Sequence, residues 1–393
     1  GERRALWHAA DGASDTHALL GNLRDTDIYV LHGTKDDNVP VGEAEHLVKG
    51  LEGLGIEPLV HYAEGRGHWW DGEEAAGADC VDWPPIFEMF ASPRRKVPSA
   101  GFEWTTADLS VDAEHGRWGI DQPLRYGARS SLHVRYDAAA KRVVVETSNV
   151  RRLRTRNWRG SAALLIDGQP LTPACSDDRH VWDVALERDG EGGTWRQVAG
   201  EVASEQKRRA RMGPFKRAFD HRFVLVHGTA GHTHEDAALL ASARYDAEQW
   251  RYRANGHAEC VSDTFFLAHP QRYRDRNVIL YGNATTNAAW GAVLDPRCPI
   301  HAERGRLRVG DRTWQGEALG LLLVYPRKDS AVAQVAVVGD TGVPGTRLGF
   351  RLPIFLSGVG IPDYVAYGPA VLRRGDGGVL AAGFFDRDWR IQP

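Results

Sequence analysis

The first 95 residues alternate between short apolar runs and amphipathic stretches. Residues 28–32 (IYVLH) form a continuous β-rich run that ends at a Gly-Thr pair, as a buried parallel strand does. Apolar residues then recur every three or four positions over 44–54, which predicts a helix, and Gly55 stands where a helix end favours positive φ. A second strand is expected over 58–62 and a short helix over 82–90. This order of strand, helix, strand and helix is typical of an α/β sheet.

A different pattern begins near Pro93. Apolar and polar positions alternate around Leu132, Val134 and Tyr136, and turn pairs such as Asp167-Gly168 recur. Alternation broken by such turns predicts mostly antiparallel β structure over residues 100–200.

Strands and a long helix return after the charged stretch that ends near Arg211. Buried strands are expected at 223–226, 278–281, 321–325 and 332–338, and a helix over 235–253. We therefore predict three parts: an α/β part over 1–95, a β-rich domain over 96–212 and a second α/β domain over 213–393.

Composition narrows the possible functions. The 393 residues are 42% hydrophobic and 26% charged, with a formal net charge of −3, which describes an ordinary globular chain. Nucleic acid is not an expected partner, because the one basic cluster, Lys207 to Arg211, is short and is expected to be a solvated linker. No run approaches the roughly 18 apolar residues that a membrane span requires.

Neither a metal nor a cofactor is expected. The four cysteines, Cys80, Cys175, Cys260 and Cys298, lie far apart and show no zinc-binding spacing. His232, His234, Glu235 and Asp236 include suitable ligand types, but acidic residues are also expected at the start of a helix, and the spacing suggests no third ligand. The GTAGH loop before them (residues 228–232) lacks a P-loop signature, which favours a plain strand-to-helix turn over an anion site. The Gly-rich segment 339–349 is expected to be a binding loop or a flexible connection.

Two side chains carry the candidate chemistry. Asp36 follows the first strand in LHGTKDDNVP, and His68 follows the second in EGRGHWW. Acyl transfer by a serine hydrolase needs a base to deprotonate the serine and a carboxylate to orient that base. In α/β-hydrolases these groups come in the order Ser, Asp or Glu, then His, on loops after successive strands. Asp36 and His68 fit the last two positions, although each taken alone could be a turn or core residue.

The stretch from His32-Gly33 through Asp36 to Gly67-His68 resembles the C-terminal end of the prolyl oligopeptidase and dipeptidyl peptidase family of serine peptidases. The resemblance implies an α/β-hydrolase fold, with Asp36 as catalytic acid and His68 as catalytic base, a peptide substrate and no cofactor. It also implies that Asp37 caps or braces the loop. Three stretches of the C-terminal part resemble a C-terminal extension of large bacterial members: GPFKRAFDHRFVLVHGT (213–229), NVILYGNATTNAAW (277–290) and DYVAYGP (363–369).

One part of the family pattern is missing. No GxSxG motif occurs in the 393 residues, so we expect a C-terminal fragment whose serine lies upstream of Gly1. Such a fragment should be inactive and prone to aggregate, because a truncated sheet exposes an edge.

Alternative functions remain open from the sequence. The same triad serves esterases, including those acting on carbohydrate esters, and the chain could instead be a non-catalytic binding or interaction module. The pair Trp69-Trp70 is expected to pack against neighbouring side chains in the wall of the site, in preference to forming a substrate-binding surface. Localisation and oligomeric state are not fixed by the sequence, although the family resemblance allows secretion or a periplasmic site.

Overall fold

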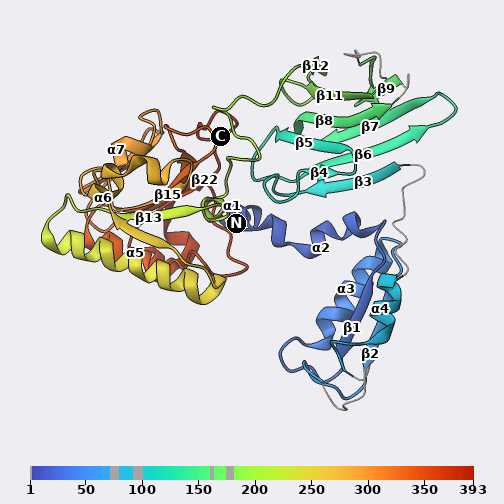
Figure 1. Ribbon diagram of the computed structural model, residues 1–393, viewed down its shortest axis with the longest axis horizontal. Coiled ribbons are helices and arrows are strands. Elements are labelled where there is room, and N and C mark those ends of the chain that lie inside the picture. Colours follow the sequence, from blue (N-terminus) through green and yellow to red (C-terminus); the bar gives the residue numbers. More distant parts are fainter. Residues whose placement is uncertain (1, 71–78, 92–100, 160–162, 174–180) are drawn as a thin grey trace.

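The computed structural model describes residues 2–70, 79–91, 101–159, 163–173 and 181–393. Figure 1 shows three regions: a small sheet drawn in blue at the lower right, a β-rich region, and a larger sheet flanked by helices. Mixed sheets and helices agree with the expected α/β class. The predicted boundary at residues 95/96 and Cys175 lie outside the described residues, and the division into three domains stays a prediction.

The N-terminal region contains the predicted strand, helix, strand and helix. Short helices precede it: α1 (Glu2–Ala10), η1 (Gly12–Ser14), α2 (Thr16–Leu19) and η2 (Leu20–Leu23). The four elements that follow are β1 (Tyr29–Gly33), α3 (Val41–Gly53), β2 (Leu59–Ala63) and α4 (Pro84–Ala91). β1 and β2 pair in parallel, with Gly33 opposite Ala63, so both strands end at the same edge. α3 packs its apolar stripe onto β1 through Ala44 and Val48 against Val30.

The β-rich region consists of two five-stranded sheets, in the orders β10-β9-β7-β6-β3 and β12-β11-β8-β5-β4. All neighbours are antiparallel except β7 and β9. Side chains from both sheets share one core that includes Trp104, Leu132, Val145 and Leu153. The strands are β3 (Gly101–Thr106), β4 (Glu114–His115), β5 (Trp118–Pro123), β6 (Ser130–Asp137), β7 (Arg142–Ser148), β8 (Val150–Arg159), β9 (Ala163–Ile166), β10 (Gln169–Leu171), β11 (Val181–Glu187) and β12 (Arg196–Val198).

The C-terminal region is built on a seven-stranded sheet in the order β14-β13-β15-β20-β19-β21-β22. The first four strands are parallel, and the last three continue the sheet in antiparallel pairs. The strands are β13 (Phe223–His227), β14 (Glu259–Ser262), β15 (Asn277–Tyr281), β19 (Gly320–Pro326), β20 (Gln334–Asp340), β21 (Tyr364–Tyr367) and β22 (Val379–Gly383). A separate three-stranded sheet contains β16 (Ile300–Glu303), β17 (Arg306–Val309) and β18 (Arg312–Gln315).

Helices cover both faces of the large sheet, because alternate strand residues point to opposite sides. Val224 and Val278 contribute to one apolar cluster, whereas Leu225 and Ile279 contribute to the other, on the α5 side. The helices are η3 (Phe215–Phe219), α5 (Thr233–Ala254), α6 (Asp263–Ala268), η4 (Pro270–Tyr273), α7 (Trp290–Val293), α8 (Val343–Gly349), α9 (Val371–Arg374) and η5 (Gly375–Gly378). No helix of the described residues is both long enough and apolar enough to cross a bilayer.

The structure corrects two expectations. The basic cluster is not a solvated linker throughout, because Lys207 and Arg211 are only 1% and 5% exposed. The Lys207 ammonium forms an ion pair with the buried Asp363 and lies 4.4 Å from the centre of the Tyr126 ring. The segment 339–349 is not a flexible connection, because β20 ends at Asp340 and α8 begins at Val343.

Candidate active site

The loop after β1 places the Asp36 side chain at the carboxyl edge of the small sheet. Oδ1 of Asp36 accepts hydrogen bonds from the backbone N–H groups of Asn38 and Val39, each at 2.9 Å. These bonds fold the loop around its own carboxylate, as an Asp-centred turn does. The sequence expectation gave Asp37 the role of capping or bracing the loop, but in the described residues the loop N–H groups bond to Asp36, and the Asp37 side chain is exposed.

The loop after β2 holds His68 against this turn. Lys35 donates its backbone N–H to the Arg66 carbonyl at 2.8 Å, and the Thr34 hydroxyl accepts the Gly65 N–H at 2.8 Å. The two loops are thus joined at residues 34–35 and 65–66, just before Asp36 and His68. This brings the two candidate side chains together although they are 32 residues apart.

Gly33 permits this close approach of the loops. A Cβ atom at residue 33 would lie 2.4 Å from the carbonyl oxygens of Arg66 and Gly67. Contacts this short with backbone atoms cannot be relieved by a side-chain rotation. Glycine is therefore required at the end of β1 for the His68 loop to lie where it does.

The carboxylate and the imidazole are in direct contact. His68 Nδ1 lies 2.9 Å from Asp36 Oδ2, and the two side chains are 34% and 6% exposed. An ionised carboxylate only accepts hydrogen bonds, so Nδ1 carries the proton in this contact. A neutral His68 then has its lone pair on Nε2, for which the described residues offer no hydrogen-bond partner. The arrangement orients a base toward a partly open space.

The surroundings of Asp36 keep its carboxylate ionised. Partial burial acts to raise the pKa of Asp36, but hydrogen bonds from Val39, His68 and Asn38 outweigh it, and the net effect is a lowered pKa. A carboxylate held in the charged form stabilises an imidazolium beside it, which a base that takes up a proton requires.

His32 is a neighbour that the sequence did not single out. Its Nε2 lies 3.7 Å from Asp36 Oδ2, while its Nδ1 lies 3.0 Å from the Gly33 carbonyl oxygen. His32 lies in β1, four residues before Asp36. The His32-Gly33 pair in the sequence was the one feature that could have pointed to this neighbour. Asp36 therefore has two histidines near one oxygen, and His68 is the closer one.

The two tryptophans after His68 have different environments. Trp70 is buried, as expected of wall packing, whereas Trp69 is 75% exposed. The Trp69 ring meets the His68 ring edge-on at 5.4 Å. The prediction of wall packing is thus right for Trp70 and wrong for Trp69.

Comparison with known proteins identifies the family that the N-terminal region resembles. Residues 4–80 match the model of the prolyl oligopeptidase family. The resemblance to that family is confirmed over these residues, which include both Asp36 and His68. A curated fungal relative, an uncharacterized secreted protein of Arthroderma benhamiae, is 25% identical over 98% of the chain. The chain spans only 42% of the length of that relative. No solved structure matches the chain.

The other candidate sites of the sequence do not form comparable constellations. The N–H groups of Gly231 and His232 bond to Asp236 and Glu235 on the same helix, so the loop before α5 uses its amides internally. Glu235 is also paired with Arg304 at 2.7 Å, and this ion pair contributes to lowering the Glu235 pKa to about 2. Among the described residues, no group of three or more His, Cys, Asp or Glu side chains could hold a metal ion.

Proposed function

We propose that Asp36 and His68 are the acid and the base of a Ser-Asp-His triad in a serine hydrolase of the prolyl oligopeptidase type. The observation that carries the proposal is the 2.9 Å contact between Asp36 Oδ2 and His68 Nδ1. Its position at the ends of two parallel strands, in the order Asp then His, is that of an α/β-hydrolase. The match of residues 4–80 to the peptidase family supports the same activity.

In the proposed mechanism, His68 Nε2 takes the proton of a serine hydroxyl as the serine attacks the substrate carbonyl. His68 then gives this proton to the leaving group, and Asp36 holds the imidazole in the required tautomer throughout. The serine is proposed to lie outside residues 1–393, since these contain no GxSxG motif. Residues 1–393 alone should then show no turnover.

The test is labelling of the full-length parent protein with a fluorophosphonate, which reacts with an activated serine. We expect His68→Ala to slow labelling by about 10³-fold or more, because the serine loses its base. His46→Ala is the matched control, because His46 is an exposed histidine on α3, and it should label at the parent rate. Equal labelling of the parent and His68→Ala contradicts the proposal, and a parent without an elbow serine favours a binding module.

We further propose a peptide bond, next to proline, as the bond cleaved. The support is the family that residues 4–80 match, since the described residues do not form the pocket that would choose a substrate. Peptides with proline before the cleaved bond should therefore be hydrolysed faster than acetyl esters of comparable size. The reverse preference identifies an esterase on the same fold.

A further inference from the structure

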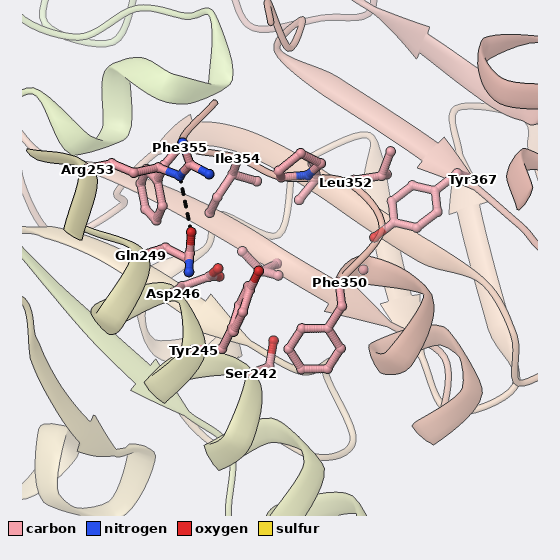
Figure 2. Close-up of a pocket in the computed structure, with 14 residues that line it drawn as sticks. Ser242, Tyr245, Asp246, Gln249, Arg253, Phe350, Leu352, Ile354, Phe355 and Tyr367 are labelled. Atoms are coloured by element: carbon pink, nitrogen blue, oxygen red, sulfur yellow. Dashed lines mark hydrogen bonds between the residues drawn. The ribbon is translucent and has the colours of Figure 1, made fainter. Parts of the chain in front are cut away.

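A pocket of the C-terminal region opens between α5, the segment that follows α8, and β21 (Figure 2). α5 contributes Ser242, Tyr245, Asp246, Gln249 and Arg253. Phe350 and Phe355 face them from the segment after α8, and Tyr367 closes the pocket from the sheet. The cavity is small, about 30 Å³, which is enough for one or two water-sized groups.

The one carboxylate that lines this pocket, Asp246, forms no ion pair with the described residues. Asp246 is 9% exposed, and the Tyr281 hydroxyl at 2.9 Å is the single hydrogen-bond donor that the described residues supply to it. Burial raises the pKa of Asp246 to about 7, and the Tyr281 hydrogen bond offsets only part of this effect. A buried carboxylate without a counter-charge is costly, so a cation that entered the pocket would relieve that cost.

The charged and titratable groups around Asp246 do not supply this cation. Arg253 is the one basic residue that lines the pocket, and its Nε donates to the Gln249 side-chain oxygen at 3.1 Å instead. Tyr245, Tyr281 and Tyr367 are the other titratable neighbours, from α5, β15 and β21. The lining residues between 349 and 355 are all uncharged.

Aromatic rings form much of the remaining wall. Tyr245 and Phe350 are 40% and 39% exposed, and their rings meet edge-on at 5.2 Å. Tyr367 is 1% exposed and lies deeper. Aromatic faces attract organic cations, and the effect strengthens where water is excluded.

We propose that this pocket binds a primary ammonium group, with Asp246 as its counter-charge and the rings of Tyr245, Phe350 and Tyr367 around it. The volume of about 30 Å³ accommodates an ammonium with a single carbon substituent and excludes a trimethylammonium head. A hard metal ion fits less well, because such ions take six or more oxygen ligands and the pocket offers one carboxylate. The site is independent of the proposed hydrolase activity.

Methylammonium chloride is the probe for this site, and sodium chloride at equal ionic strength is the reference. We expect saturable binding of methylammonium to the intact protein at pH 8 by calorimetry, and about tenfold weaker binding at pH 6, where most of Asp246 is protonated. Tetramethylammonium should not bind. Absence of saturable methylammonium binding, or equal binding of methylammonium and tetramethylammonium, overturns the proposal.

Variants separate Asp246 from general charge effects. Asp246→Asn keeps the shape of the side chain and should abolish binding, whereas Tyr245→Ala should weaken it severalfold by removing one exposed ring. Glu248→Gln is the matched control, since Glu248 is an exposed acid two residues further along α5, and it should bind as the parent does. Unchanged binding in a folded Asp246→Asn protein also overturns the proposal.

Discussion

The two oxygens of the Asp36 carboxylate have separate partners. Oδ1 accepts the N–H groups of Asn38 and Val39, and Oδ2 contacts His68. One side chain thus shapes its loop and orients the neighbouring ring. An Asn side chain at residue 36 has a single acceptor oxygen. It cannot accept hydrogen bonds both from the N–H groups of Asn38 and Val39 and from the N–H of His68.

Asp36→Asn should therefore slow fluorophosphonate labelling of the full-length protein by about 10³- to 10⁴-fold, because the ring is held in the wrong tautomer. Asp37→Asn is the matched control one residue away, and we expect the parent rate because its side chain is exposed. A stronger effect at Asp37 than at Asp36 would reverse the assignment of the acid. Labelling rates at fixed probe concentration give the comparison.

Asp246 gives the protein a pH-dependent stability. Its pKa of about 7 in the folded state is above the ordinary value of 3.8, so the folded state binds the proton more tightly than the unfolded state does. The contribution of this group to the free energy of unfolding is therefore largest below pH 4 and declines as the pH rises to 7. The total decline is on the order of 4 kcal/mol.

Asp246→Asn removes this dependence because its amide stays neutral. In the absence of amines, we expect the variant to melt at a higher temperature than the parent at pH 8 and at a similar temperature at pH 4. Melting curves of both proteins at the two pH values, in an amine-free phosphate buffer, provide the measurement. A variant less stable than the parent at pH 8 would contradict a buried, ionised Asp246.

At the scale of elements, the site depends on how closely β1 and the loop after β2 approach. Gly33→Ala should displace the Arg66 and Gly67 carbonyls, destabilise the protein by about 1–3 kcal/mol and slow serine labelling. Gly53→Ala is the control, because an added Cβ there meets no atom within 4 Å and alanine favours the helix. If the Gly33→Ala protein has the stability and labelling rate of the parent, residue 33 does not approach the Arg66 and Gly67 carbonyl oxygens as closely as described above.

The elements of the small sheet were predictable from sequence because their periodicity is strong. The predicted strands at 28–32 and 58–62 correspond to β1 and β2, and the contact of Asp36 with His68 follows from their parallel pairing. Burial of single charged residues was not predictable. Lys207 stands among other basic residues, and its partner Asp363 is 156 residues away, so no local pattern marks the pair. Asp246 is likewise one of many polar residues along the predicted helix, and nothing in the local sequence marks it as buried.

At the scale of the whole molecule, Lys207 joins the C-terminal region to the β-rich region. Its ammonium pairs with Asp363 just before β21, donates to the Phe385 carbonyl at 3.0 Å and lies over the Tyr126 ring of the β-rich region. Removing one partner of a buried ion pair leaves the other charge uncompensated, which costs more than the pair itself contributes.

Lys207→Met should destabilise the protein by about 3–5 kcal/mol, because Asp363 is left charged and buried. The double variant Lys207→Met, Asp363→Asn should regain part of this loss, since it removes both charges. Chemical denaturation of the parent, both single variants and the double variant measures the coupling. If the stability lost in the double variant equals the sum of the losses in the two single variants, the two side chains are not coupled, and the ion pair is contradicted.

The first helix also connects distant parts of the chain. A Cβ atom on Gly360 would lie 2.4 Å from the Trp7 carbonyl oxygen, so α1 rests directly on the segment before β21 (Figure 1). α1 lies largely within the residues that match the peptidase family, and eighteen residues separate its end from β1. The part of the chain that matches the peptidase family is therefore packed, near its start, against the C-terminal region.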